Sequence, residues 1–406
     1  MSFSLRPVHV YIALGSLALV AIGAVIYMAG GFELTPPVPF GAPLRDGNRV
    51  FLLTGQWRDR TNDIEDVTYS LNELFVDIWA FDAVTMKPVF RKRLQKVERG
   101  AMDDRQILGL QNQTLWVRLP DGPHAINRDT GALAATPGSL QRLNPELRGL
   151  LPTEARYYSF SDSGLAVKTA DAKVWYVRPD NFLVSSTPLT TAGRGIIPPY
   201  MAPQSYSSYL ERGFDMGSKW LGLLNPEEAV TFAKNHAIRG LDYQSRRSLY
   251  SADITKETTF FGPQNRYSNF KSLTEEFLAP GILSDHRPTG KNALIFQRDP
   301  DSVFVLHLDR LGEEGRVHLT RVAGPGGKVL WSTPLQLSLM KCLMFDDQAL
   351  VMYGVVYRRQ NPNGGVRRDP LHTATGKLLS LNWATGALAV FDHADTKKHP
   401  EATPAQ

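Results

Sequence analysis

The sequence contains a single cysteine, Cys342, in its 406 residues. One thiol excludes an intrachain disulfide and a metal site built on cysteines. Cys342 stands in the apolar run LMKCLMF, where a free cysteine behaves as a small buried hydrophobic residue. The sequence therefore predicts no disulfide and gives no indication of a metal site.

Linear catalytic motifs are also missing. The chain has no G-x-S-x-G elbow, no H-E-x-x-H pair and no G-x-G-x-x-G after a strand, which are signatures of serine hydrolases, zinc proteases and dinucleotide-binding enzymes. Residues 324–328 (GPGGK) carry the glycines of a phosphate-binding loop, but Val329 stands where Ser or Thr must bind Mg²⁺. His307 and His318 lie on strands that we expect to be neighbours, where they can meet in a structural role.

Charged residues are absent from residues 7–32, and residues 8–30 are almost continuously apolar. A segment of this length crosses a bilayer as a helix. Arg6 precedes it and the next basic residue is Arg45, so the positive-inside rule places the tail of residues 1–7 in the cytoplasm. The sequence thus predicts a single-pass protein of the inner (cytoplasmic) membrane whose remaining chain lies in the periplasm.

The residues after the apolar segment suggest further divisions. Small residues at 29–31 (AGG) leave a cleavable signal peptide as an alternative to the membrane anchor. Residues 31–46 are rich in proline, which is typical of a stiff, extended spacer. A folded domain is expected over residues 47–395, followed by a disordered tail at 396–406.

The overall composition is that of a globular protein, with 43% apolar and 21% charged residues. The formal net charge is +5, from 45 basic and 40 acidic residues, which is an ordinary balance for a soluble surface. We expect no nucleic-acid partner, because the domain is predicted to lie outside the cytoplasm.

One short pattern occurs four times along the chain. The pattern runs from a small or apolar residue through Asp or Asn, then Thr or Ser, to a short hydrophobic run; its copies are residues 80–90 (AFDAVTMKPVF), 125–135 (AINRDTGALAA), 240–250 (GLDYQSRRSLY) and 380–390 (SLNWATGALAV). The aligned polar residues are Asp82 with Thr85, Asn127 with Thr130, Asp242 with Ser245, and Asn382 with Thr385. Asx and Thr side chains bind backbone N–H groups of a turn, and Gly131 and Gly386 supply positive φ where a turn needs it. Each copy therefore predicts a β-hairpin.

Segments rich in β-forming residues precede these hairpins, so each repeat has at least three consecutive strands. Weaker units of the same kind cover residues 165–188 and 302–334. Repeated sheet units at this spacing favour an all-β fold, a β-propeller of about six blades with a range of five to eight. Long connections are expected on one face of the propeller, at residues 58–73, 190–217, 225–236, 255–292 and 358–377. Helical insertions are expected in two of them, at 225–228 (NPEE) and 268–278 (SNFKSLTEEFL), which carry helix-start or helical-spacing signals.

The repeated pattern resembles the PQQ-like repeat of quinoprotein-type propellers, A-x-D-x-x-T-G-x-x-x-W. Trp331 resembles the closing tryptophan of that repeat, whereas Met86 replaces its Gly, and Phe90 and Tyr250 stand where Trp is usual. The resemblance covers about residues 47–395 and implies the propeller architecture. Quinoprotein dehydrogenases of this type bind PQQ over Ca²⁺, many with an adjacent cysteine pair, which the single cysteine excludes; no cofactor is therefore expected.

These observations predict a membrane-anchored module of the cell envelope that binds a protein partner or acts as a scaffold, without catalysis. The alternatives are an enzyme of quinoprotein dehydrogenase or hydrolase type with its site in the propeller channel, and an envelope inhibitor of immunity type. Aromatic and arginine side chains in the expected long loops are the candidate binding residues. They are Tyr200, Tyr206, Tyr209, Arg358, Arg359, Arg367 and Arg368.

Overall fold

The computed structural model describes most of the predicted domain. The described residues are 33–34, 37–64, 67–98, 105–161, 164–188, 210–211, 213–216, 218–235, 246–259, 262–286, 292–294, 302–311, 315–324, 326–345, 349–357 and 374–393. Within them the fold is all-β, built from antiparallel sheets, and no sheet closes on itself. None of the helices found there has the length and apolarity to span a bilayer, and the predicted anchor at 8–30 lies outside the described residues.

Sheet I comprises the first six strands. They are β1 (Glu33–Leu34), β2 (Val38–Pro39), β3 (Leu44–Asp46), β4 (Arg49–Ile64), β5 (Val67–Asp82) and β6 (Pro88–Glu98). β4 and β5 pair over their whole length, from Arg49 opposite Asp82 to Ile64 opposite Val67. The long connection expected at 58–73 is therefore wrong, because those residues continue the hairpin as paired strands. Part of the segment expected as a spacer also lies in this sheet, since β2 and β3 pair with β4.

Sheets II and III follow, each with four strands in sequence order. Sheet II holds β7 (Gln106–Gln111), β8 (Thr114–Leu119), β9 (Gly122–Asn127) and β10 (Leu133–Ala135); sheet III holds β11 (Tyr158–Ser161), β12 (Gly164–Lys168), β13 (Val174–Val177) and β14 (Val184–Ser185). Between them lie α2 (Pro137–Leu143) and the 3₁₀ turns η1 (Pro145–Leu147) and η2 (Ala155–Tyr157). Thr136 and Ser139 form a reciprocal capping box that begins α2.

A ten-stranded sheet comes next, and we call its two halves sheets IV and V. Sheet IV holds β16 (Gly213–Met216), β17 (Lys219–Leu224), β18 (Arg246–Thr259) and β19 (Gly262–Ser272); sheet V holds β20 (Phe277–His286), β22 (Ser302–Leu308), β23 (Val317–Ala323) and β24 (Val329–Pro334), with β15 (Leu210–Glu211) and β21 (Asn292–Leu294) beside β20. The long connection expected at 255–292 is wrong, and so is the helix expected within it at 268–278, because this part of the chain forms β19 and β20. Pairing with β18 satisfies their backbone groups and overrides the helical spacing of the apolar residues.

The other predicted helix is present as α3 (Pro226–Asn235), in the connection that follows β17. Asn225 Oδ1 accepts the Glu228 N–H at 2.8 Å, and Glu228 Oε2 accepts the Asn225 N–H at 3.1 Å. This reciprocal pair and the proline at the first helical position fix where α3 begins. The helix prediction at 225–228 is confirmed.

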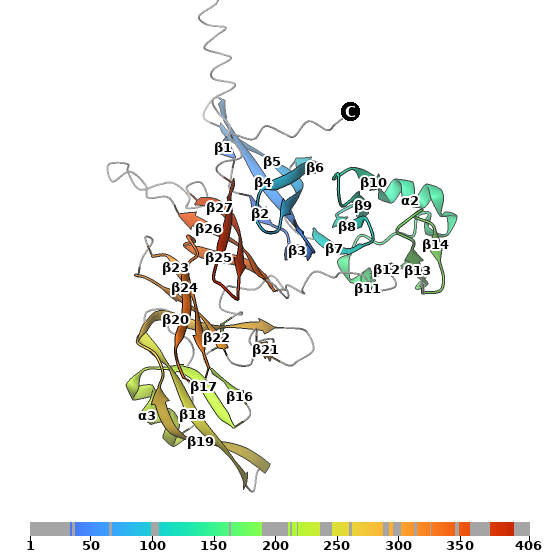
Figure 1. The fold of residues 1–406 in the computed structure, drawn as a ribbon. Coiled ribbons are helices and arrows are strands. Elements are labelled where there is room, and N and C mark those ends of the chain that lie inside the picture. Colours follow the sequence, from blue (N-terminus) through green and yellow to red (C-terminus); the bar gives the residue numbers. More distant parts are fainter. Residues whose placement is uncertain are drawn as a thin grey trace, which may run out of the picture.

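Sheet VI is formed by β25 (Leu339–Phe345), β26 (Ala349–Tyr357), β27 (Ala374–Asn382) and β28 (Leu388–Asp392). Neighbouring sheets follow one another along an open arc, in the order III, II, I, VI, V and IV (Figure 1). Separate apolar clusters join IV to V, V to VI, I to II and II to III. Another cluster joins sheet VI to sheet I, the last sheet of the chain to the first.

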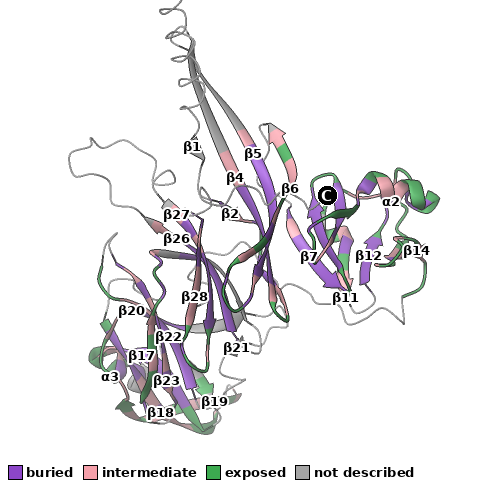
Figure 2. Cartoon of the chain, turned by 45° about the horizontal axis from the view of Figure 1, so that its top comes forward, coloured by how far each residue is buried: buried purple, intermediate pink, exposed green. Residues whose placement is uncertain are grey.

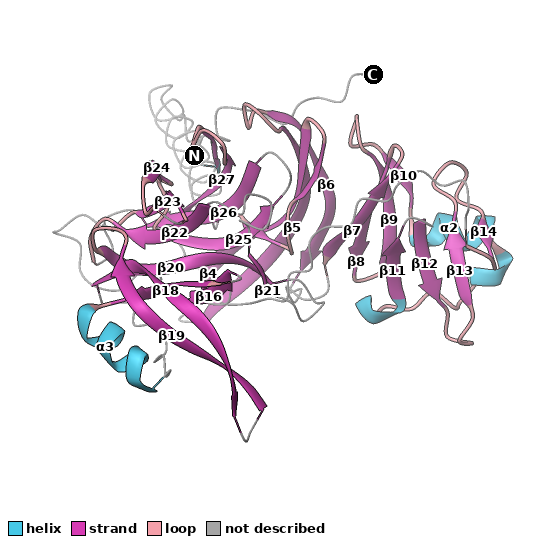
Figure 3. Cartoon of the chain, turned by 60° about the horizontal axis from the view of Figure 1, so that its bottom comes forward, coloured by secondary structure: helices cyan, strands magenta, loops and turns pink. Residues whose placement is uncertain are grey.

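Sheets IV and III, at the two ends of this arc, have different neighbours. On the outer side of sheet IV, Trp220 and Phe270 pack with Phe232 of α3. At the other end, sheet III stands beside sheet II (Figure 3). Among the described residues none of the six apolar clusters joins sheet III to sheet IV. The buried residues follow the strands, whereas the outer faces of α2 and α3 are largely exposed (Figure 2).

Three of the four predicted hairpins are confirmed in atomic detail. Asp82 Oδ1 accepts the N–H and hydroxyl of Thr85, both at 2.8 Å, and these bonds hold the pKa of Asp82 below its usual value. Asn127 with Thr130, and Asn382 with Thr385, repeat both bonds at 3.0 and 3.1 Å. The fourth hairpin, at Asp242, lies outside the described residues.

Sheets III and V contain the same turn without the Asx residue. In each turn the backbone N–H of the first residue donates to the carbonyl of the sixth, and the N–H of the fifth residue donates to the carbonyl of the first. The turns begin at Asp82, Asn127, Arg178, Ala323 and Asn382. The fifth residue always has positive φ: Met86, Gly131, Phe182, Gly327 and Gly386 at 55–73°. The backbone repeat is therefore more regular than the sequence repeat.

Candidate functional site

The seven predicted binding residues cannot be placed in the fold. Tyr200, Tyr206, Tyr209, Arg358, Arg359, Arg367 and Arg368 all lie outside the described residues. Their role stays a prediction, and so does the expectation that the long loops gather on one face.

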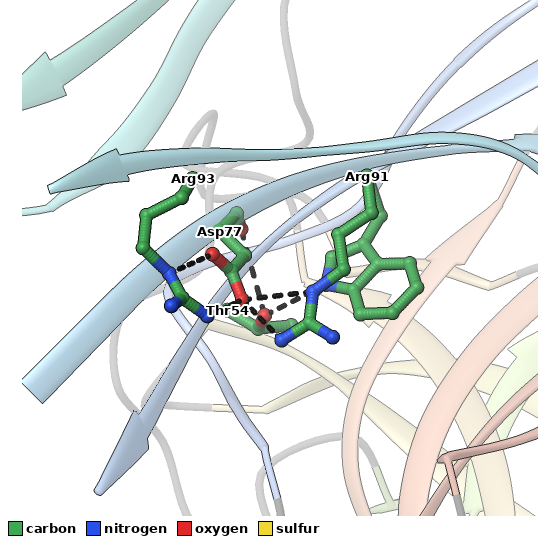
Figure 4. A network of polar contacts seen from close by, with 5 residues as sticks. Thr54, Asp77, Arg91 and Arg93 are labelled. Carbon is green, nitrogen blue, oxygen red and sulfur yellow. Dashed lines mark hydrogen bonds and ion pairs between the residues drawn. The ribbon is translucent and has the colours of Figure 1, made fainter. Parts of the chain in front are cut away.

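The described residues do contain a charged cluster on sheet I, drawn in Figure 4. Asp77 of β5 lies opposite Arg93 of β6, and Trp79 lies opposite Arg91. Because strand alternation turns these four side chains to one face, both guanidinium groups reach the same carboxylate. Arg91 Nε and Nη2 donate to Asp77 Oδ2 at 3.0 and 2.6 Å, whereas Arg93 Nε donates to Oδ1 at 3.0 Å.

Aromatic rings hold the two guanidinium groups in place. The Arg91 guanidinium lies 4.7 Å from the centre of the Trp79 ring, and that of Arg93 lies 4.2 Å from the centre of the Phe75 ring. The Trp79 Nε1–H donates to Thr54 Oγ1 at 3.1 Å, which fixes the ring beneath Arg91. Stacking and charged hydrogen bonds together orient each arginine.

The cluster carries an excess of positive charge. Asp77 is only 2% exposed, whereas the Arg91 and Arg93 side chains are 24% and 38% exposed. Two guanidinium groups share one carboxylate, so the local formal charge is +1. Lys96 and Glu73, farther along the same strands, form their own ion pair at 2.8 Å and leave that balance unchanged.

His393 lies next to this cluster, where sheet VI packs on sheet I. Its ring meets those of Trp79, Phe391 and Tyr353 with centres 4.8–5.7 Å apart. Burial lowers the pKa of His393 to about 3, and the nearby charge of Arg91 acts in the same direction. The imidazole is therefore neutral in the folded protein at physiological pH.

A second polar cluster lies between sheets II and III. Arg118 is fully buried and donates to the Thr153 carbonyl, and the Tyr158 hydroxyl donates to the Pro152 carbonyl. Burial raises the pKa of Tyr158. These bonds tie the segment between the two sheets to their strands, so we assign this cluster a structural role.

The predicted meeting of two histidines in sheet V is confirmed. His307 and His318 lie directly opposite each other on β22 and β23, with ring centres 5.5 Å apart. His307 Nε2 is 2.9 Å from Thr320 Oγ1, and burial lowers the pKa of His307. Within the described part of the chain, no group of three or more His, Cys, Asp or Glu residues is placed to hold a metal ion.

Sequence reasoning missed the cluster around Asp77. A signal was present, since the strand LFVDIWAF places one acid in an otherwise apolar run, and the next strand carries the triplet RKR at 91–93. A buried acid is seldom found without a cationic partner. The pairing register that brings these residues together cannot be read from either strand alone.

Comparison with known proteins does not identify a family. No family model and no curated protein matches the chain. One similar solved structure is the computationally designed Ika8 protein, with 10% identity over 89% of this chain and 87% of that one and a TM-score of 0.19. Another is Kuenenia stuttgartiensis hydrazine synthase, with 12% identity over 76% of this chain and 73% of that one and a TM-score of 0.20. A puromycin-hydrolysing peptidase of Mycobacterium tuberculosis is also similar, with 12% identity over 87% of this chain and 52% of that one and a TM-score of 0.23. At such TM-scores these likenesses support no argument about fold or function.

Proposed function

We propose that this protein is a membrane-anchored, extracytoplasmic β-propeller of about six blades that acts as a non-enzymatic protein-binding or scaffold module of the cell envelope. The observation that carries the proposal is the packing of sheet VI on sheet I, the last sheet of the chain on the first. A propeller has this relation between its first and last blades. Apolar clusters also join the other neighbouring sheets, except sheets III and IV among the described residues.

Contacts between aromatic residues and the turns of adjoining sheets also support a propeller. Gly131, in the turn of sheet II, lies against Phe90 of sheet I, so closely that an added Cβ would meet that ring at 2.7 Å. Gly386, in the turn of sheet VI, lies against Trp331 of sheet V in the same way, at 2.8 Å. An aromatic residue that follows one turn thus packs on the turn of the adjoining sheet. This contact is consistent with the likeness to PQQ-like repeats.

Binding rather than catalysis is favoured by the form of the outer elements. From Thr255 outward, β18 pairs only with β19, and most side chains of this two-stranded ribbon are exposed. A ribbon of two strands buries little apolar surface and contributes little to stability. It is therefore well suited to contact another protein, as are the loops that carry the seven predicted residues.

Affinity capture of the full-length protein from its own membranes tests the proposal. We expect a protein partner to be captured in stoichiometric amount. The partner should be lost when residues 256–265 are replaced by a two-residue Asn-Gly turn, and also when residues 360–368 are deleted. Neither change should shift the melting temperature of the protein by much. A reporter fused to the C-terminus should behave as exported. A cytoplasmic reporter, or capture without any partner, would contradict the proposal.

A further inference from the structure

We propose that Arg91 and Arg93 form a clamp for a carboxylate-bearing ligand on the face of sheet I that is turned toward sheet VI. This inference does not depend on the scaffold role. It rests on the geometry of two guanidinium groups that converge on one buried carboxylate and still have unused donors.

Each arginine uses only one of its edges to bind Asp77. An arginine has five N–H donors in a planar fork, and both side chains direct Nε and Nη2 inward. The Nη1 groups of Arg91 and Arg93 make no hydrogen bond or ion pair within the part of the chain that the structure describes. Figure 4 shows outer nitrogens of both groups directed away from Asp77.

The two groups are positioned before any ligand arrives. Asp77 fixes their inner edges, and the rings of Trp79 and Phe75 fix their planes. A ligand that binds the outer edges therefore loses little affinity to side-chain ordering, which otherwise opposes binding. Their partial exposure leaves those edges accessible to solvent.

The charge and the shape of the site favour a carboxylate. The cluster carries a formal charge of +1, which favours an anion. The planar edge of an arginine binds a carboxylate through two parallel hydrogen bonds. Such a carboxylate can belong to a small dicarboxylic acid or to an acidic side chain of a protein partner, and the chemistry of recognition is the same.

Isothermal titration calorimetry of the full-length protein separates these sources, with malonate, a hexaglutamate peptide and inorganic phosphate as probes. We expect binding of at least one carboxylate probe. Tighter binding of malonate supports the clamp with a small ligand, and tighter binding of the peptide supports the clamp with an acidic protein segment. Failure of both carboxylate probes to bind, or binding of phosphate alone, would overturn the proposal.

Lys92 provides the matched control. It lies between the two arginines in the chain, and it is exposed. Lys92 pairs with Ile78, whose side chain packs toward sheet II. The Lys92 side chain therefore belongs to the opposite face of sheet I. We expect Arg91→Gln and Arg93→Gln to weaken carboxylate binding about tenfold, the effect of losing one charged hydrogen-bond pair. Lys92→Gln removes the same charge and should change the dissociation constant by less than about twofold, because exposed charges act weakly.

Arg93→Lys distinguishes geometry from charge. It keeps the positive charge but loses the planar fork, so we expect a loss close to that of Arg93→Gln. This variant also serves if a glutamine variant fails to fold, which thermal unfolding of each protein would show. Equal affinity for Arg93→Lys and the unchanged protein, or equal losses for Lys92→Gln and Arg93→Gln, would contradict the clamp.

Discussion

The two faces of sheet VI are held by different interactions. Toward sheet V the contact is apolar, and Trp331 and Arg321 donate to the Trp383 carbonyl at 3.1 and 3.0 Å. Toward sheet I the apolar cluster adjoins the buried His393 and the charged Asp77 cluster. The junction between sheets V and VI is therefore held by apolar contacts and hydrogen bonds to a backbone carbonyl, whereas the junction between sheets VI and I also contains a buried imidazole whose pKa is lowered by burial.

Removal of a large apolar side chain should have the greatest effect, and it should be independent of pH. Phe304, which is 1% exposed, packs between the rings of Trp331 and Trp383. We expect Phe304→Ala to lower the free energy of unfolding by about 3–5 kcal/mol, the usual cost of such a cavity. Urea unfolding at two pH values measures this effect. Val329→Ala, at an exposed position, should cost less than about 0.5 kcal/mol.

Loss of the shared carboxylate should come next. Asp77→Ala leaves Arg91 and Arg93 facing each other without a counter-charge, so we expect a loss of about 1–3 kcal/mol, limited by the partial exposure of both arginines. Asp121→Ala is the control, because the Asp121 side chain is 55% exposed where it contacts His124 Nε2, and this contact should contribute under about 1 kcal/mol. Equal losses of stability for the two substitutions would show that the Asp77 cluster stabilises the protein no more than an exposed contact does.

Acid should weaken the junction between sheets VI and I through His393. Burial holds its pKa at about 3 in the folded protein, whereas the unfolded chain takes up a proton below a pKa of about 6.5. Stability from this group is thus complete above pH 6.5 and is lost as pH falls toward 3, by about 2 kcal/mol at pH 5. His393→Leu should remove that part of the pH dependence. A parallel pH profile for both proteins would contradict the burial of a neutral His393.

The smallest effect is expected at the repeated turns, which have the same geometry in sheets II and VI. Asn382→Ala and Asn127→Ala each remove three hydrogen bonds, two from a threonine and one from another backbone N–H. Each substitution should cost about 0.5–1.5 kcal/mol, because these bonds are exposed. Differential scanning calorimetry of the two variants measures the difference between them. A large difference would show that the turns are not equivalent. The same substitution at Asp242 tests the fourth predicted hairpin.

The accuracy of the sequence-based predictions follows the range of the interactions involved. The hairpins at Asp82, Asn127 and Asn382 were predictable because an Asx side chain, a threonine and a residue with positive φ define the turn locally. The start of α3 was predictable for the same reason, from Asn225 and Glu228. The helix expected at 268–278 failed because pairing with β18, which is not local, decides its conformation.

Other features carry little sequence signal. The polar residues at 58–73 lack the apolar alternation of a half-buried strand, so their pairing as a long hairpin could not be predicted. The convergence of Arg91 and Arg93 on Asp77 depends on the register of β5 and β6. The return of sheet VI onto sheet I joins residues about three hundred positions apart, and no short pattern specifies that contact.

A double-mutant cycle between Phe81 of sheet I and Phe391 of sheet VI tests this contact most directly, because their ring centres lie 4.8 Å apart. The unchanged protein, Phe81→Ala, Phe391→Ala and the double variant would be unfolded in urea under the same conditions. If the last sheet packs on the first, the two substitutions should be coupled by about 0.5–1.5 kcal/mol, as is usual for aromatic rings in contact. Additive effects within about 0.3 kcal/mol would contradict it.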